Sequence, residues 1–438
     1  MECGSRRSPS GVRACSAFTE PLRGGVARGE ATASAGVRQT GRVSHRTVAE
    51  HRAAIVAMLR RRPAETIPAD RHAADRRLAT DLLAVDDLPR FDSSAMDGYA
   101  VSPASADPRV FPVVGDVAAG DPADFRLERG QAARIMTGAR VPTGALAVVP
   151  VERTDAQPTG PAPAEVTVEG DIDPGQHIRR CGDDTAAGSV IAARGSLITP
   201  GLVALARSAG VTTVDVFSRT RLAVVATGAE LTRPGADPGK GGIHESNSEM
   251  IAALAAQTGC DVVRVETCTD DPDTLRSLLD DLDADERIDL VVTTGGVSQG
   301  AYEVVRQVCG PLPSFEFVHL AMQPGGPQGL GTYGRTPVVC LPGTPTGAFV
   351  SFVMLLRPGL DHLHGRPPRE AGSAAYAGHT RRTRRGRVQY LTSVVADGRV
   401  RTGDRHHLSA LAEANALIEV PYEVDELVDG DLVTVHAL

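Results

Sequence analysis

The chain has 438 residues, a formal net charge of −8, only 3% aromatic residues and no tryptophan. A chain of this length holds about two to four domains. The acidic balance and the scarcity of aromatic rings argue against a surface that binds nucleic acid, which needs basic charge and stacking platforms. No apolar run reaches about 18 residues, so the sequence predicts no membrane span.

The N-terminal region, residues 1–43, is rich in Arg, Gly, Ser and Ala and lacks both clear periodicity and the apolar core of a secretory signal. We expect a disordered tail or sequence upstream of the true start. The seven cysteines are scattered and form neither a CxxC pair nor a Cys/His ligand cluster. Such usage is typical of reduced thiols in a cytoplasmic protein.

Regular structure is expected from about Ser44 onward. The stretch VAEHRAAIVAMLRRR (residues 48–62) has apolar residues at helical spacing, and Pro63 ends it. Short β-like runs separated by Gly, Pro and Asp fill residues 101–181, which predicts a small β-rich domain. From Arg221 strands alternate with helices, which predicts a parallel α/β sheet. A second β-rich composition follows residue 365.

Within the α/β region, SNSEMIAALAAQTG predicts a helix that is capped by Ser246 or Asn247 and ends at Gly259. The stretch PDTLRSLLDDLDA predicts another helix, with Pro272 in its first turn. The strand IDLVV leads into TTGG, and a further helical pattern begins near Ala301.

Four loops follow the expected strands: ATGAEL (226–231), TDDP (269–272), TTGGVSQGAYE (293–303) and LPGTPTG (341–347). Ligands bind beyond the carboxyl ends of strands in open α/β sheets. Glycine lets backbone N–H groups approach an anion closely. Carboxylates beside such loops suggest a phosphorylated substrate with a divalent cation.

Each signal also has a structural interpretation. A Gly-Gly turn after a strand is common, Asp270-Asp271 before Pro272 is typical of a helix cap, and Asp97 before Gly98 is typical of a turn. The occurrence of all four loops in strand order favours a site.

Seven segments occur in the order expected of one known family. The chain resembles the MoeA family, the molybdopterin molybdenumtransferases related to the C-terminal part of gephyrin, from about residue 45 to the end. The matching segments are LPRFDSSAMDGYAV, RIMTGARVPTGALAVVPVE, IRRCGDDTAAGSVI, VVATGAELTRPG, SNSEMIAAL, TTGGVSQGAYE and LPGTP.

The resemblance implies an elongated, multidomain α/β plus β architecture. The expected parts are a discontinuous linker and dimerisation domain, a β-rich domain, a parallel α/β molybdopterin-binding domain and a C-terminal β-barrel-like domain. We place these parts, in that order, at residues 44–68 plus 186–217, 69–185, 218–365 and 366–438.

The family reaction inserts molybdenum from molybdate into adenylylated molybdopterin and releases AMP, with Mg²⁺ as the expected cation. The resemblance also implies a cytoplasmic homodimer whose cleft lies between the α/β domain of one subunit and the second domain of the other. A transient contact with molybdopterin adenylyltransferase is implied as well, and neither nucleic acid nor membrane is expected as a partner.

The site residues are carried over motif by motif. Asp97, Glu230 and Asp270 are expected to organise the metal and water. The complete set implied for catalysis is Asp97, Thr137, Asp184, Glu230, Asp270 and Glu303. Contacts to the pterin or its phosphate are implied for Gly295, Gly296, Val297, Ser298, Gly300, Pro342, Gly343, Thr344 and Pro345.

Several positions depart from the family pattern. Three basic positions of the family's KLAIKPGKP read His319, Gln323 and Gly326 here. Lysines there would act as point charges on phosphate or molybdate. The acid expected at 301 is Ala301, and Glu303 is one methylene longer than the family's aspartate. Ala229 replaces another acid, and Thr344 and Gly347 replace an asparagine and a serine.

Two classes of function follow from these observations. Retention of the second-domain motifs favours a divergent molybdenumtransferase. Loss of the basic positions favours a non-catalytic MoeA-like paralogue that binds molybdopterin or acts in cofactor assembly or regulation.

Overall fold

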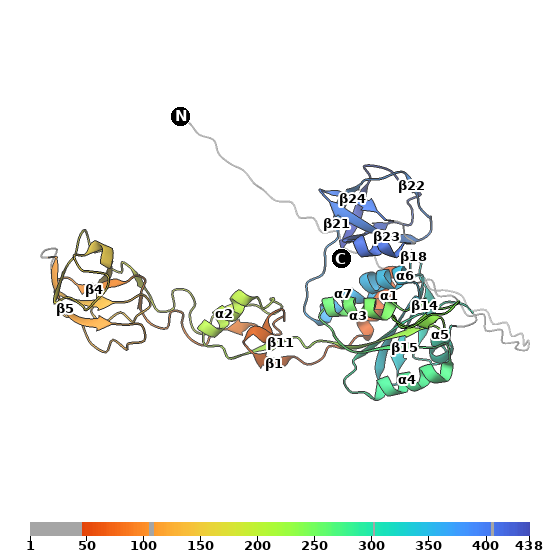
Figure 1. The fold of residues 1–438 in the computed structure, drawn as a ribbon, viewed down its shortest axis with the longest axis horizontal. Coiled ribbons are helices and arrows are strands. Elements are labelled where there is room, and N and C mark those ends of the chain that lie inside the picture. Colours follow the sequence, from red (N-terminus) through yellow and green to blue (C-terminus); the bar gives the residue numbers. More distant parts are fainter. Residues whose placement is uncertain (1–45, 105–108, 301–302, 404–406) are drawn as a thin grey trace, which may run out of the picture. The chain divides into compact units, whose positions relative to one another are not determined.

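The computed structural model describes residues 46–104, 109–300, 303–403 and 407–438 (Figure 1). The expected tail at residues 1–43 lies outside this part of the chain, as does Ala301. In the residues that the structure describes, no helix combines the length and the hydropathy needed to cross a bilayer.

The α/β domain is built on a six-stranded sheet with strand order β15-β12-β16-β20-β19-β17. The first four strands are parallel, which confirms the α/β prediction, and β19 and β17 add an antiparallel edge. The strands are β12 (Arg221–Thr227), β15 (Asp261–Cys268), β16 (Leu290–Thr294), β17 (Glu316–His319), β19 (Pro327–Tyr333) and β20 (Thr336–Leu341).

The antiparallel edge was not predicted, because β19 carries glycines that lower its β propensity. The structure shows why they are there. A Cβ at Gly329 would lie 2.7 Å from the ring of Phe317, and one at Gly331 would overlap the ring of Phe315. The two phenyl rings therefore lie directly against the glycine backbone.

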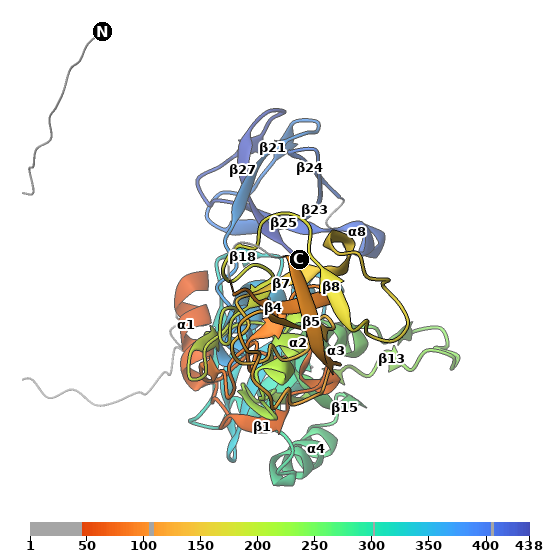
Figure 2. The same ribbon diagram turned by 90° about the vertical axis from the view of Figure 1, so that its left-hand side faces the viewer.

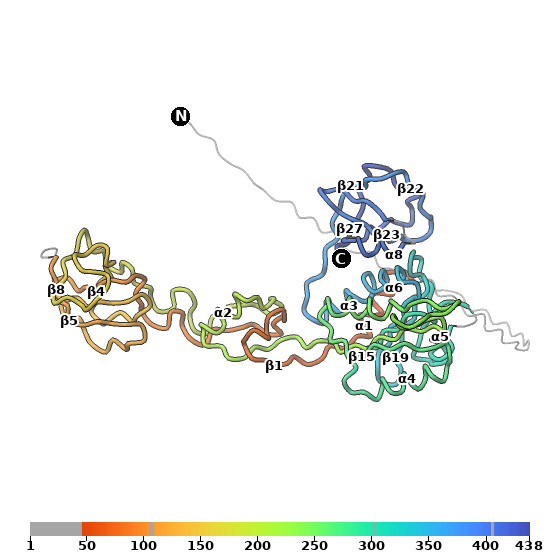
Figure 3. Tube along the Cα trace, viewed as in Figure 1, coloured from red at the N-terminus to blue at the C-terminus, as the bar shows by residue number. Residues whose placement is uncertain are grey.

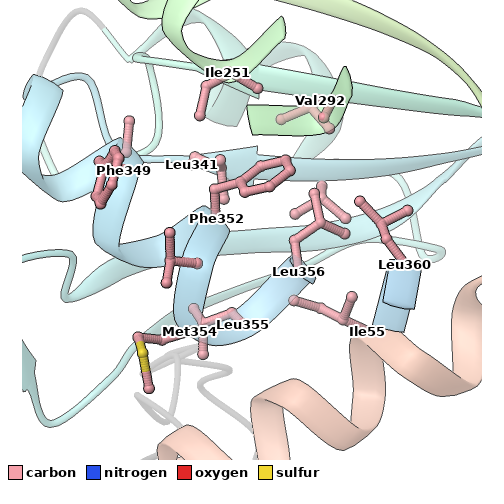
Figure 4. Close-up of a cluster of buried hydrophobic side chains, with 14 of the residues drawn as sticks. Ile55, Ile251, Val292, Leu341, Phe349, Phe352, Met354, Leu355, Leu356 and Leu360 are labelled. Carbon is pink, nitrogen blue, oxygen red and sulfur yellow. The ribbon is translucent and has the colours of Figure 1, made fainter. Parts of the chain in front are cut away.

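Two hydrophobic cores cover the two faces of the sheet. Along β12, Leu222 and Val224 point into one core, and Ala223 and Val225 point into the other. Figure 4 shows side chains of the first core, including Ile55. The helices on that side are α1 (Val48–Met58), α3 (Asn247–Gln257), α6 (Pro345–Ser351), η3 (Phe352–Leu356) and α7 (Arg357–Leu363), and those on the other are α4 (Pro272–Ala284) and α5 (Val304–Cys309).

The expected long helix after LPGTPTG is interrupted by the π-helical turn η3. Pro358 causes the change, because it has no N–H to donate to the carbonyl four residues earlier, at Met354. The Nε of Arg52 on α1 donates to that carbonyl at 2.8 Å instead. Helix α1 is therefore held to η3 by a polar contact as well as by its apolar face.

The β-rich lobe, residues 82–192, contains a five-stranded sheet in the order β7-β4-β6-β5-β8. Short strands pair around it, and β3 with β9 brings Ser93 opposite Arg179. The strands are β2 (Leu82–Leu83), β3 (Ser93–Ser94), β4 (Gly98–Ser102), β5 (Val110–Val117), β6 (Gln131–Ile135), β7 (Ala147–Pro150), β8 (Glu165–Thr167), β9 (Ile178–Arg179) and β10 (Val190–Ala192), with η2 (Val151–Arg153).

Two distant stretches of sequence run beside each other through strand pairing (Figure 3). Strand β1 (Glu65–Pro68) pairs antiparallel with β11 (Thr213–Val216), and β2 pairs with β10. Helices η1 (Arg71–Ala73) and α2 (Pro200–Ser208) share a small core with these strands. The chain thus passes through this region twice, once before and once after the β-rich lobe.

The C-terminal strands form a small barrel, seen in Figure 2. The order β18-β23-β24-β21-β27-β25 is closed by a further pairing of β23 with β25, which confirms the barrel-like expectation. The elements are β18 (Met322–Gln323), β21 (Gly372–Tyr376), β22 (Arg381–Arg382), β23 (Val388–Ala396), β24 (Arg399–Thr402), α8 (Leu408–Glu413), β25 (Ala416–Val420), β26 (Glu426–Leu427) and β27 (Leu432–Ala437).

We expect Ile55→Ala to destabilise the α/β domain. Ile55 is fully buried in the core shared with η3 and α7, and truncating such a side chain costs about 2–5 kcal/mol. Urea unfolding followed by circular dichroism measures the change. Val190→Ala, at a side chain that is 55% exposed, is the control. Equal stability of the two variants would show that α1 is not part of this core.

Candidate functional site

A cleft of about 570 Å³ lies at the carboxyl ends of the parallel strands. Strands β15 and β16 flank β12 on opposite sides. The order in which the chain adds strands therefore reverses between β12 and β16, and α/β sheets bind ligands at such a point. Most of the predicted site residues line it. They are Glu230, Asp270, Glu303, Gly295, Gly296, Val297, Ser298, Pro342, Gly343, Thr344 and Pro345.

The floor of the cleft depends on two glycines after β16. Gly295 has φ +92° and Gly296 φ +65°, a region that side chains disfavour. A Cβ on Gly295 would overlap the carbonyl oxygen of Thr227, and one on Gly296 would lie 2.9 Å from the Val305 nitrogen. Val297, at 3% exposure, anchors the loop in the core. Because the side chain is buried, only the backbone of Val297 is open to the cleft.

Glu303 closes the loop that Gly295 begins. Its carboxylate accepts a hydrogen bond from the backbone N–H of Ser298 at 2.8 Å. This contact occupies the Ser298 amide, so Ser298 offers a ligand its hydroxyl. A Cβ at Gly300 would lie 2.9 Å from the same carboxylate, which makes Gly300 a packing residue outside the cleft lining.

Asp270 and Asp271, the two neighbouring aspartates after β15, make different contacts. Asp271 is the N-cap of α4, since its carboxylate accepts the Thr274 N–H at 2.9 Å. Asp270 lines the cleft and accepts the backbone N–H of Ala229 at 3.0 Å. The capping interpretation is therefore correct for Asp271, and Asp270 links the loops after β15 and β12.

Asn247 and Glu245 are two of the cleft residues that were not predicted as site residues. Asn247 donates through its Nδ2 to the carbonyl of Gly343 at 2.6 Å, and its Oδ1 is buried without a partner in the described chain. Glu245 accepts from the backbone N–H and the hydroxyl of Ser248. Ser246 takes the N-cap position of α3 but its side chain makes no capping bond. The expected N-cap position at Ser246 is confirmed, but the side-chain bond to the first turn comes from Glu245.

Only a weak signal for Asn247 is present in the sequence. An asparagine at a helix start normally serves as a cap, whereas here its amide reaches the loop after β20. The unpartnered Oδ1 matters because buried polar atoms are normally hydrogen-bonded. Thr294 also lines the cleft with a hydroxyl that is buried and has no partner among the described residues. Both residues line the cleft, and both atoms lack a hydrogen-bond partner among the described residues.

His319, Gln323 and Gly326, the three positions where the family has basic residues, lie beside the cleft. Gly326 follows Gly325 and precedes Pro327, which both line it. A Cβ at Gly326 would lie 2.7 Å from Nε2 of His319, so the imidazole occupies the space of a side chain at 326. Gln323 lines an adjoining pocket that shares Thr344 with the cleft. The replacements at His319 and Gly326 are thus sterically coupled.

The carboxylates of the cleft fit a cation that the substrate brings with it. The described lining contains Glu230, Glu245, Asp270 and Glu303 but no arginine or lysine. Glu245 and Glu303 accept hydrogen bonds within the protein, which leaves Glu230 and the Oδ1 of Asp270, whose Oδ2 accepts the Ala229 N–H. No group of three or more His, Cys, Asp or Glu in the described ranges could hold a metal. Mg²⁺ commonly uses one or two carboxylates together with substrate phosphates.

The remaining predicted residues lie in the β-rich lobe. The carboxylate of Asp97 accepts hydrogen bonds from the hydroxyl and the backbone N–H of Thr137, at 2.7 and 2.6 Å. These bonds lower the pKa of Asp97. Asp184 is exposed in a neighbouring turn, and its N–H donates to the Leu88 carbonyl. Thr137 therefore holds the Asp97 carboxylate in place through two donated hydrogen bonds.

Comparison with known proteins follows the same division of the chain. The MoeA N-terminal region (domain I and II) matches residues 46–210, the probable molybdopterin-binding domain matches 223–362, and the MoeA C-terminal region (domain IV) matches 375–438. Molybdopterin molybdenumtransferase 2 of Mycobacterium tuberculosis is 39% identical over 403 residues, covering 88% of this chain and 98% of that protein. The chain belongs to the MoeA family.

Other members of the MoeA family agree with this placement. Molybdopterin molybdenumtransferase 1 of M. tuberculosis is 33% identical, covering 80% of this chain and 89% of that protein. The crystal structure of the MoeA protein from Pyrococcus horikosii has a TM-score of 0.78 at 26% identity, covering 90% of this chain and 99% of that one. The fold expected from the resemblance is therefore confirmed.

The glycine geometry leads to a matched test. We expect Gly295→Ala to lower activity by on the order of 100-fold, because the loop must shift and small misplacements of reacting groups are costly. Gly120 has φ +93°, and a Cβ added there would meet nothing within 4 Å. Gly120→Ala therefore carries similar backbone strain without the clash. Equal steady-state rates for the two variants would contradict this account of the floor.

Proposed function

We propose that this MoeA-family chain is a molybdopterin molybdenumtransferase that inserts molybdenum from molybdate into adenylylated molybdopterin and releases AMP. The observation that carries the proposal is the cleft between β12 and β16, where glycine loops meet the carboxylates Glu230 and Asp270. Both M. tuberculosis relatives bear the name of this activity.

The cleft supports a division of roles. The backbone of Gly295, Gly296 and Val297 and the hydroxyl of Ser298 contact the pterin or its phosphate, opposite the loop from Pro342 to Pro345. The buried Oδ1 of Asn247 accepts a donor from the pterin ring system. Glu303 positions the loop through Ser298, so its role in catalysis is indirect.

Glu230 and Asp270 are the residues that would hold Mg²⁺. When bound, the ion offsets charge on the pyrophosphate and assists its cleavage. Without it, four carboxylates and no arginine or lysine in the described lining would repel a pyrophosphate. Asp270 also holds the Ala229 N–H, which keeps the two loops at the same edge.

The proposed working form is a cytoplasmic homodimer. In it, Asp97, Thr137 and Asp184 of the β-rich lobe complete the cleft of the other subunit, and Asp97 joins the metal site. A transient contact with the adenylyltransferase would deliver the adenylylated pterin. Buried free thiols at Cys260, Cys309 and Cys340 fit a reducing compartment. The expected domain limits, with the linker and dimerisation domain split around the β-rich domain, are part of the same proposal.

The second candidate is a non-catalytic paralogue that binds molybdopterin. The observation in its favour is the missing positive charge at His319, Gln323 and Gly326. Two relatives of this chain occur together in M. tuberculosis, both with the transferase name, so one organism can carry paralogues of this family.

Activity measurements separate the two candidates. Purified protein with adenylylated molybdopterin, Mg²⁺ and molybdate should release AMP and yield cofactor that activates an apo-molybdoenzyme. Glu230→Gln and Asp270→Asn should each lower AMP release by on the order of 100-fold or more, since a metal ion supplies several kcal/mol of charge stabilisation. Asp97→Ala should also lower it.

Glu286→Gln, at an exposed carboxylate outside the cleft, is the control for these variants. Pterin binding without AMP release by the unmodified protein would favour the paralogue. Unchanged rates in Glu230→Gln and Asp270→Asn would show that the site is misplaced.

A further inference from the structure

A second cavity, of about 560 Å³, lies outside the candidate active cleft. It is bounded by α1, by η3 and α7, by the segment that leads to the C-terminal barrel and by the end of β27. Four arginines line it, Arg52, Arg357, Arg366 and Arg369, together with two carboxylates, Asp361 and Glu370. The formal surplus is two positive charges in a chain whose net charge is −8.

Arg357 is the central observation. The residue is 8% exposed, and its Nη2 donates to the carbonyl of Ala437 at 3.1 Å. No carboxylate of the described residues lies within 4 Å of its guanidinium. A buried charge without a counter-ion costs free energy, which is why buried arginines are normally paired. Burial accordingly lowers the pKa of Arg357 to about 10.

Asp361 does not neutralise the arginines around it. Its Oδ2 accepts from Nε of Arg369 at 3.1 Å, and Nε of Arg366 lies 3.7 Å from its Oδ1. This single buried carboxylate contacts two arginines, and it acts on Arg357 only electrostatically, from beyond salt-bridge distance. Arg52 uses its Nε on the carbonyl of Met354, which holds the arginine at the cavity wall.

We propose that this arginine-lined cavity binds a small tetrahedral oxyanion, either free or as the phosphoryl group of a larger molecule. Guanidinium groups donate in planar forks that match pairs of oxygen atoms on phosphate-type anions. A doubly charged oxyanion would offset the formal surplus and supply acceptors to Arg357. The cavity is separate in its lining from the cleft that carries the proposed reaction, so the inference does not depend on that function.

Isothermal titration of the full chain with inorganic phosphate, molybdate or AMP, at constant ionic strength in chloride, tests the inference. We expect binding of phosphate and molybdate, weakened at least about tenfold in Arg357→Gln and in Arg369→Gln because each loses charge-assisted bonds. Arg126→Gln, at an exposed arginine of the β-rich lobe, should bind as the unmodified protein does. Circular dichroism checks that each variant is folded.

The three probes distinguish the sources of the anion. Comparable binding of phosphate and molybdate supports a free oxyanion, whereas binding of AMP alone supports a phosphoryl group. In both cases the two cavity variants must lose affinity. Absence of binding for all three probes, or equal affinity in Arg357→Gln, Arg369→Gln and Arg126→Gln, overturns the proposal.

Discussion

The close approach of three backbone segments at the ends of β12, β16 and β20 is the constraint on which the site depends. The N–H of Gly295 donates to the Leu341 carbonyl at 3.1 Å, and a Cβ on Gly343 would lie 3.2 Å from the Cα of Gly295. A Cβ on Gly295 would in turn overlap the carbonyl of Thr227. Only glycine allows the loops to meet this closely, and their meeting forms the cleft floor.

The rest of the site follows from this contact. Once the loops after β16 and β20 touch, the amide of Asn247 spans from α3 to Gly343 and Glu303 closes the loop over Ser298. Burial of Val297 and of the apolar side chains on both faces of the sheet keeps the strand ends in register. The chemistry that we propose for Glu230 and Asp270 would take place on this packed support, while charge is divided between an acidic cleft and an arginine-lined cavity.

Much of this could be predicted from the sequence where the pattern is local. Alternation of strands and helices predicted the parallel sheet, and glycines after IDLVVTT predicted the ligand loop. Contacts between distant segments could not be predicted in this way. The edge strand β19 was missed because its glycines serve the rings of Phe315 and Phe317. Asn247 was missed because its partner, Gly343, is 96 residues away, and the interruption at η3 depends on Arg52 from α1.

We place the adenylylated pterin in the glycine-lined cleft between β12 and β16. A crystal structure of the unmodified protein soaked with adenylylated molybdopterin tests it most directly. We expect ligand density over Gly295 to Ser298, with a donor group against the Oδ1 of Asn247 and the pyrophosphate near Glu230 and Asp270. Density confined to another part of the chain, with this cleft holding only solvent, would contradict it.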